Sequence, residues 1–247
     1  MTSRVLSLHL RIWRQLGPQS PGAFENHRLE RVSADLSLLE ALDLLNERLV
    51  AAGERPVHFE HDCREGICGS CGFLVNGQAH GPRLATTVCQ LYLRQFADGD
   101  CLVLEPWRAA AFPLIQDLAV ERAALDRLIA AGGYCSVPIG SAPEANGLLV
   151  GREQARSAFE TAACIGCGAC IASCRNASAS LFVAAKLAHL GQLPQGQPER
   201  ARRAAAMQEQ MAAEGFGSCS SQLECEAVCP QQISADWISW MHREARP

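Results

Sequence analysis

Cysteine usage constrains this chain more than any other feature, since 13 of its 247 residues are cysteines and most fall in short, regularly spaced runs. An odd number of cysteines cannot all pair as disulfides within one chain. The first fifteen residues, MTSRVLSLHLRIWRQ, lack the uninterrupted apolar core of a secretory signal, so we expect a cytosolic protein. In a reducing compartment, clustered thiols serve metal or redox chemistry more often than disulfides.

Composition and charge exclude several other classes. Apolar residues make up 48% and charged residues 19%, as in ordinary soluble globular proteins. The net charge is −4 without a basic block, so nucleic acid is not expected as a partner. The most apolar run, Leu181–Leu190, is interrupted by Lys186 and His189, so the chain is not expected to span a membrane by itself.

The first part of the chain has the pattern of a hairpin with a helix packed on it. Apolar residues alternate over Leu6–Ile12, and a turn-rich segment at Gly17–Gly22 leads to a weaker strand pattern over Phe24–Val32. A helix is predicted over Leu38–Leu49, preceded by a Ser-x-x-Glu capping box and followed by Gly53. Short strands are predicted at Phe73–Val75 and Leu102–Leu104.

After Pro106 the apolar period changes from that of a strand to that of a helix. This change predicts two domains, residues 1–107 and 108–247, and an α+β fold. The helices predicted in the second domain are Gln116–Ala131, Arg152–Ala163, Ser180–Leu190, Pro198–Glu214 and Ser234–Arg243.

The first cysteine run is Cys63, Cys68 and Cys71, with the C-x4-C-x2-C spacing of the plant-type [2Fe–2S] ferredoxin loop. Such a loop needs one distant fourth thiolate. Spacing alone does not choose between Cys89 and Cys101.

Glycines separate these cysteines, at Gly66, Gly69 and Gly72, and would let the backbone wrap closely around a cluster. His58 and His61 precede the run and raise the alternative of Rieske-type ligation. The spacing is against it, because Rieske centres pair histidines with cysteines and cysteines already supply this loop.

Two related runs follow in the second half. The first is Cys164, Cys167, Cys170 and Cys174, the C-x2-C-x2-C-x3-C run of bacterial ferredoxins; the second contains Cys219, Cys225 and Cys229-Pro230. The same spacing counted back from Cys229 puts Gln222 where a fourth thiolate would stand. In two-cluster ferredoxins the fourth cysteine of each run ligates the other cluster. The exchange predicts one site of Cys164, Cys167, Cys170 and Cys229, and another of Cys174, Cys219 and Cys225.

Four thiolates hold a [4Fe–4S] cluster, whereas three thiolates beside Gln222 favour [3Fe–4S]. Zinc is the alternative, but reciprocal runs of this kind suit a single tetrahedral ion poorly. A dithiol function for Cys164 and Cys167 lacks the expected βαβ context. Cys135, and whichever of Cys89 and Cys101 is not a ligand, are interpreted as ordinary cysteines.

Other catalytic signatures are missing from the sequence: it has no G-x-G-x-x-G after a strand, no P-loop and no nucleophile elbow. We therefore expect the chain to carry electrons without binding a dinucleotide. A relay of three clusters requires an electron donor and an acceptor on partner proteins.

The order of the three runs resembles the iron–sulfur subunit of succinate dehydrogenase and fumarate reductase. The stretches that carry the resemblance are His61–Gly72, Glu105–Leu118, Cys164–Leu190 and Cys225–Pro230. TTVCQL at Thr86–Leu91 is similar to the family segment that holds the fourth [2Fe–2S] ligand, so the resemblance favours Cys89.

The resemblance implies a β-grasp ferredoxin domain followed by an α-helical ferredoxin domain. It also implies that electrons from succinate pass from a flavoprotein subunit with covalent FAD through [2Fe–2S], [4Fe–4S] and [3Fe–4S] to quinone. The subunit would hold no catalytic residue and would lie at the cytoplasmic face of the cell membrane, held by an anchor subunit. Fumarate reduction and a free, soluble ferredoxin-like carrier are the alternatives.

In the quinone region the chain departs from the best-known members of this family. Arg175, Ala179 and Ser220 stand where those members have Pro, Trp and His. Together with the 17 residues between Cys71 and Cys89, this is similar to the branch with a di-haem cytochrome b anchor, and menaquinone is the expected carrier.

Overall fold

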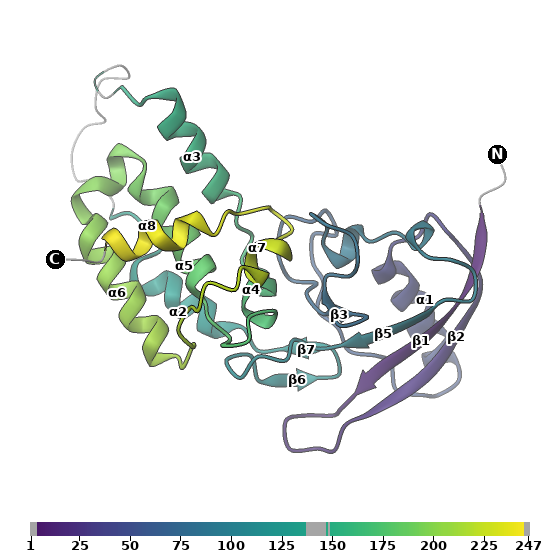
Figure 1. Ribbon diagram of the computed structural model, residues 1–247. Coiled ribbons are helices and arrows are strands. Elements are labelled where there is room, and N and C mark those ends of the chain that lie inside the picture. The colour runs from purple at the N-terminus through teal and green to yellow at the C-terminus, as the bar shows by residue number, and fades with distance from the viewer. Residues whose placement is uncertain (1–3, 137–146, 148, 245–247) are drawn as a thin grey trace.

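The computed structural model describes residues 4–136, 147 and 149–244. The molecule is elongated, with a sheet at one end and a group of helices at the other (Figure 1). The strands are β1 Val5–Arg14, β2 Ala23–Ser33, β3 Leu74–Val75, β4 Gln78–Ala79, β5 Cys101–Glu105, β6 Leu114–Gln116 and β7 Ala119–Val120. The α-helices are α1 Leu38–Ala51, α2 Ala123–Gly132, α3 Arg152–Ala162, α4 Ala169–Ala172, α5 Ser180–Gly191, α6 Arg200–Ala213, α7 Glu224–Ala227 and α8 Asp236–Glu244.

The larger sheet has the order β2-β1-β5-β3-β4. β1 and β2 form the predicted antiparallel hairpin, and β1 runs parallel to β5 with His9 opposite Cys101. The predicted alternation is confirmed, because the four apolar side chains from Leu6 to Ile12 are each at most 1% exposed. Each such side chain contributes about 1.5–3 kcal/mol to folding through burial.

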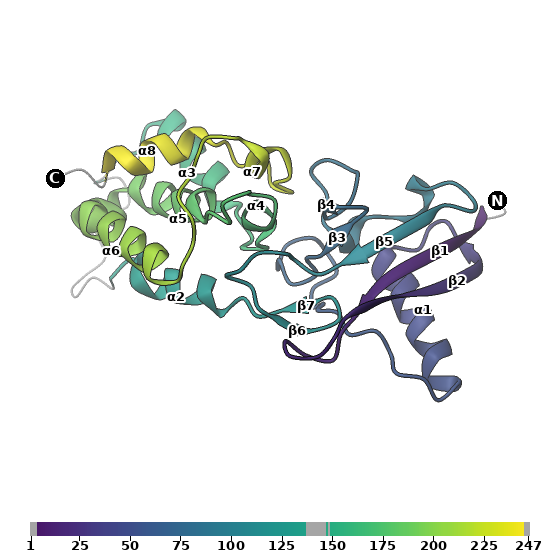
Figure 2. The ribbon, with the colours of Figure 1, turned by 60° about the horizontal axis from the view of Figure 1, so that its bottom comes forward.

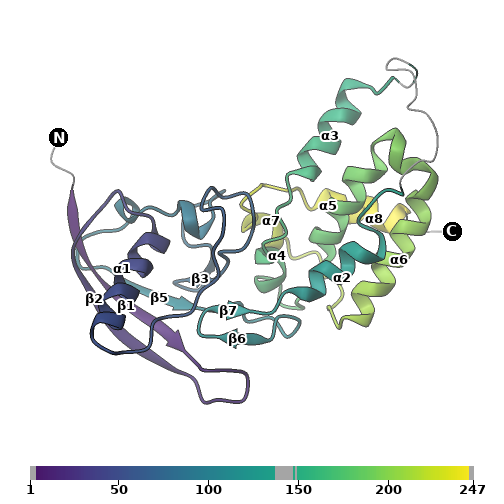
Figure 3. The ribbon, with the colours of Figure 1, turned by 180° about the vertical axis from the view of Figure 1, so that it is seen from behind.

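Helix α1 packs beside this sheet (Figure 3) and has the capping that its sequence predicts. Ser37 Oγ accepts from the backbone N–H of Glu40, and the Glu40 carboxylate accepts from that of Ser37. At the other end, Gly53 has a φ of +74°, and the N–H of Glu54 donates to Leu49 O at 2.8 Å. This left-handed turn ends the helix.

The other half is built around α5, which is buried on nearly all sides among α3, α6 and α8. A helix that is apolar all round belongs in a core. The predicted helices at α3, α5, α6 and α8 are confirmed with ends shifted by a few residues, and the α+β fold class is confirmed. In the described part of the chain, none of the helices combines the length and apolarity that crossing a bilayer requires.

One predicted helix is wrong in its first half. Residues 114–120 form the β6–β7 hairpin, and α2 begins only at Ala123. The cause is Asp117, whose fully buried carboxylate accepts from the backbone N–H groups of Gln15 at 2.8 Å and His58 at 3.0 Å. Arg55 also donates to it, at 2.8 Å. These contacts stabilise a turn at Asp117 instead of a continuous helix.

Candidate functional site: three groups of thiols

The first thiol group consists of Cys63, Cys68, Cys71 and Cys89. The first three lie on the loop between α1 and β3, and Cys89 lies on a 3₁₀ turn at Val88–Gln90. Side-chain hydrogen bonds join Cys63 to Cys68 and Cys71 to Cys89. Cys101, the other candidate, is exposed at the start of β5. The structure therefore brings Cys89 into the first group.

Hydrogen-bond donors converge on two sulfurs of this group. The backbone N–H of Glu65, 3.3 Å from Cys63 Sγ, lowers the pKa of that thiol to about 7. Hydrogen bonding to Cys71, and to Thr87 Oγ1 at 3.2 Å, lowers the pKa of Cys89 to about 6. These donors favour thiolates, the form that binds iron.

Two glycines of this loop lie too close to neighbouring side chains to be replaced freely by larger residues. Gly66 has a φ of +78°, and a Cβ there would lie 3.2 Å from Thr87 Oγ1. A Cβ on Gly72 would lie 2.5 Å from the ring of Trp107. Larger residues at these positions would force the loop away from its neighbours.

The two histidines that precede this loop contact neighbouring side chains. His58 Nε2 lies 3.7 Å from the Glu60 carboxylate, and the ring of His61 lies 5.4 Å from that of Phe59. Both histidines are exposed.

The second thiol group consists of Cys164, Cys167, Cys170 and Cys229, which line one cavity. Ile165, Phe182 and Ile233 also line it, so its surroundings are largely apolar. Burial raises the pKa of the Cys167 thiol to about 12 and raises that of Cys170 well above its usual value. Cys229 therefore lies beside the first bacterial-type run, in the arrangement that the exchange of fourth cysteines predicts.

The third thiol group consists of Cys174, Cys219 and Cys225. They line a cavity of about 400 Å³ together with Gln222 and several serines. Burial, with smaller contributions from the sulfurs of Cys219 and Cys174, raises the pKa of the Cys225 thiol to about 11. Cys174 is therefore grouped with the last run, and Gln222 shares the cavity with the three thiols.

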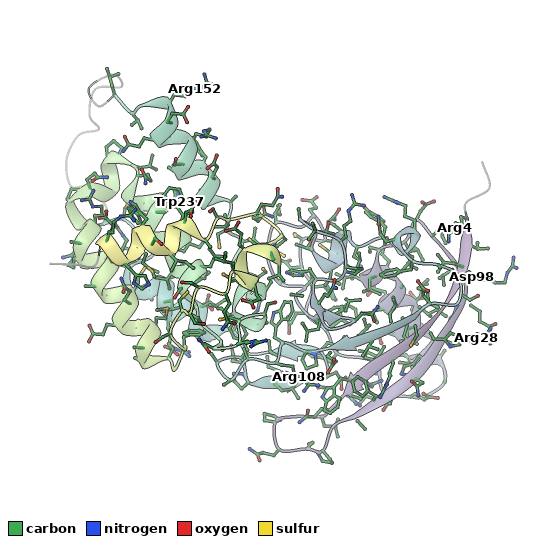
Figure 4. All side chains as sticks on the ribbon, in the orientation of Figure 1. Arg4, Arg28, Asp98, Arg108, Arg152 and Trp237 are labelled. Carbon is green, nitrogen blue, oxygen red and sulfur yellow. The ribbon has the colours of Figure 1, made fainter. Side chains whose placement is uncertain are left out.

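The short helices α4 and α7 carry parts of the second and third groups. Both lie on the side of the helical half that faces the sheet, as the turned view also shows (Figure 2). In the side-chain view, Arg108 lies where the two halves meet and Arg152 lies at the outer end of α3 (Figure 4). Parts of the second and third thiol groups therefore lie on the side of the helical half nearest the sheet half, which carries the first group.

The donor set fits iron–sulfur clusters. Soft thiolate ligands select such clusters, and backbone N–H groups donate to Cys219 Sγ and Cys229 Sγ, both at 3.4 Å. Within the described residues, no three His, Cys, Asp or Glu side chains lie close enough to share a single metal ion.

Cys135 and the three departures in the quinone region have other surroundings. Cys135 Sγ lies 3.8 Å from Arg203. Ala179 is buried in the helical core, and Ser220 Oγ lies 3.0 Å from Asn176 Nδ2. Arg175 is exposed.

Sequence reasoning missed three residues that contact the thiol loops. Lys186 Nζ donates to Cys164 O at 2.8 Å, and Trp107 Nε1 donates to Cys167 O at 3.2 Å. Arg122 donates to backbone carbonyls of two loops. Trp107 lies within a stretch that resembles the family, but no local pattern marks Arg122.

Residues 9–127 match the family model described as "2Fe-2S iron-sulfur cluster binding domain", and residues 160–233 match "4Fe-4S dicluster domain". The fumarate reductase iron-sulfur subunit of Escherichia coli O6:H1 is 28% identical over 205 residues, which cover 81% of this chain and 77% of the relative. The succinate dehydrogenase iron-sulfur subunit of Bacillus subtilis is 26% identical over 209 residues, with the same shares covered. The chain belongs to the family of iron–sulfur subunits of succinate dehydrogenase and fumarate reductase.

The fold also resembles that of a solved structure. A chain of "Mycobacterium smegmatis Sdh1 complex in the apo form" superimposes with a TM-score of 0.66 at 19% identity, covering 98% of this chain and 96% of that chain. As a member of its family, this protein is an electron-transfer subunit of an oxidoreductase that carries [2Fe–2S] and [4Fe–4S] cluster domains.

Proposed function

We propose that eleven cysteines hold three clusters. The ligands are Cys63, Cys68, Cys71 and Cys89 for [2Fe–2S]; Cys164, Cys167, Cys170 and Cys229 for [4Fe–4S]; and Cys174, Cys219 and Cys225 for [3Fe–4S]. The observation that carries the proposal is the exchange between the runs, with Cys229 in the cavity of the second group and Cys174 in that of the third. When bound, such clusters pass single electrons.

Gln222 is the residue that distinguishes the third site in this proposal. It lines the same cavity as the three thiols and stands where the run spacing calls for a fourth. A neutral amide is a poor ligand for iron compared with a thiolate. We therefore assign [3Fe–4S] to this site.

The protein functions as the iron–sulfur subunit of a succinate dehydrogenase (quinone) in the tricarboxylic acid cycle. A flavoprotein subunit with FAD supplies electrons, and a membrane anchor, a di-haem cytochrome b, binds the quinone that accepts them. The division at residues 1–107 and 108–247 separates the cluster sites, although Leu118 packs in the first core and Ala79 in the second. The subunit lies at the cytoplasmic face of the membrane.

Fumarate reduction is the second candidate. The names of the relatives are compatible with either direction, because the Escherichia coli fumarate reductase subunit and the Bacillus subtilis succinate dehydrogenase subunit are about equally similar to this chain. Menaquinone as the carrier is compatible with both directions. Its support is the replacement of three residues of the usual quinone region by Arg175, Ala179 and Ser220.

The test is anaerobic purification of the tagged chain with its co-purifying subunits. We expect a brown complex with flavin and haem and with about nine iron atoms per iron–sulfur chain. Rates of succinate oxidation and fumarate reduction, measured with quinones of high and low potential, distinguish the two directions. A colourless chain that contains zinc but neither iron nor acid-labile sulfide would overturn the proposal.

A further inference from the structure

Arg122 joins the loops of the first and second thiol groups. It is the residue immediately before α2, and its Nη1 donates to Gly69 O at 2.5 Å. The same nitrogen lies 3.3 Å from Cys167 O and 3.4 Å from Gly166 O. One guanidinium nitrogen therefore contacts carbonyl groups of two loops that are almost a hundred residues apart in the sequence.

The two loops also touch directly. Gly69 has a φ of +74°, and a Cβ there would collide with Ile165 O and lie 3.0 Å from the amide nitrogen of Cys167. Trp107 also contacts both loops, since its Nε1 donates to Cys167 O at 3.2 Å and its ring lies against Gly72. The two ligand loops therefore meet through main-chain atoms, and the side chains of Arg122 and Trp107 contact the loops at this junction.

The charge of Arg122 is as relevant as its hydrogen bonds. A guanidinium is always protonated in proteins. Its hydrogen bonds here go to neutral carbonyls, and among the described residues Arg122 makes no ion pair within 4.0 Å, so its positive charge lies at this junction without a directly bonded carboxylate. A nearby positive charge favours the reduced form of a cluster, because reduction adds a negative charge.

We propose that Arg122 is a positioning residue for electron transfer between the first and second clusters. It holds Gly69 and Cys167 together, which fixes the separation of the two ligand loops, and its charge raises the reduction potentials on both sides. Each transfer moves a single electron from one cluster to the other. This proposal rests on the ligand assignment under Proposed function.

The test compares Arg122→Gln and Arg122→Lys in the whole complex by potentiometric EPR titration. Arg122→Gln removes the charge and the fork, so the potentials of the [2Fe–2S] and [4Fe–4S] clusters should both fall, and the magnetic interaction between the reduced clusters should weaken. Arg122→Lys keeps a charge but loses the fork. It should retain the potentials and still weaken the interaction.

Arg127→Gln is the matched control, because Arg127 lies on the same helix but is exposed and paired with Glu214 at 2.7 Å. It should leave potentials and interaction unchanged. If Arg122→Gln keeps both at wild-type values, the inference is overturned. If that variant does not assemble, unchanged magnetic interaction in Arg122→Lys overturns it instead. Absence of both cluster signals from the unaltered protein would refute the ligand assignment itself, which is a different result.

Discussion

The second and third thiol groups share one cysteine spacing but lie in different surroundings. The second has four sulfurs in a cavity lined by apolar residues such as Phe182 and Ile233. The third has three sulfurs in a cavity lined also by Gln222, acidic residues and serines, of which Ser178 and Ser180 are buried and 2.8 Å apart. The same cysteine spacing therefore occurs in a largely apolar cavity at one position and in a more polar cavity at the other.

Burial raises the thiol pKa values of Cys167 and Cys170 in the second group more than that of Cys225 in the third. It raises the pKa of Cys167 to about 12 and of Cys170 well above its usual value, whereas Cys225 rises to about 11. Thiols with raised pKa values become thiolates only when metal compensates the charge. We therefore expect the larger effects from changes to the sulfurs of the second group.

Removing a sulfur from the second group should have the largest effect. Cys229→Ser should abolish the [4Fe–4S] signal of the reduced enzyme and lower electron transfer from succinate to quinone by about 100-fold or more, because a thiolate ligand is replaced by a hydroxyl, which binds iron less well. Iron content and EPR check it. Cys135→Ser is the control and should keep all three signals. Unchanged iron content in Cys229→Ser would show that Cys229 is not a ligand.

Adding a sulfur to the third group should make it resemble the second. Gln222→Cys supplies the fourth thiolate, so the oxidised-state [3Fe–4S] signal near g of about 2 should disappear and the potential of the centre should fall. Ser221→Cys is matched, because it adds a thiol to the same cavity one position out of register. It should leave the signal intact. Absence of that signal from the unaltered protein would contradict the three-thiolate assignment.

The loop of the first thiol group packs against the loop of the second at Gly69, and a substitution there should have a smaller effect than the two changes above. Gly69 and Gly53 both have a φ of +74°, but a Cβ at Gly53 has nothing within 4 Å, whereas one at Gly69 collides with main chain. Gly53→Ala should cost about 1 kcal/mol of unfolding free energy and Gly69→Ala about 3 kcal/mol. The midpoints of thermal unfolding measure the difference. Equal midpoints would mean that the loops do not pack as closely as described.

The sequence predicts well what local spacing determines. Alternating apolar residues give β1, capping residues give α1, and cysteine spacing gives the membership of the second and third groups. The ligand assignments themselves stay predictions. The choice of Cys89 came from family resemblance, because spacing treats Cys101 equally.

What the sequence does not predict depends on contacts between distant residues. The β6–β7 hairpin replaces a helix because Asp117 receives hydrogen bonds from Gln15, Arg55 and His58, which lie far away in the sequence. Arg122 has the same character, since its acceptors belong to two separate loops. Periodicity and spacing contain no information on such partners.

The smallest expected effect concerns His80, whose ring packs against Trp107, a residue that contacts the second group. The two rings are 5.4 Å apart and edge to face, and His80 is 1% exposed. Burial, with a smaller contribution from Arg122, lowers the pKa of His80 from 6.5 to about 4. Its imidazole is therefore neutral in the folded protein at neutral pH.

Acidification should destabilise the fold through this group. The unfolded chain takes up a proton below a pH of 6.5, whereas the folded protein does so only near 4, so the unfolded state binds more protons in this window and stability falls as the pH falls. Between about pH 7.5 and about pH 5.5 the loss is about 1 kcal/mol. His80→Asn, which suits the positive φ of 63°, should remove this part of the pH dependence. Denaturant unfolding at both pH values checks it, with His61→Asn as an exposed control. If the unfolding free energy of His80→Asn falls with pH as steeply as that of the wild type, burial of His80 beside Trp107 is not the cause of this pH dependence.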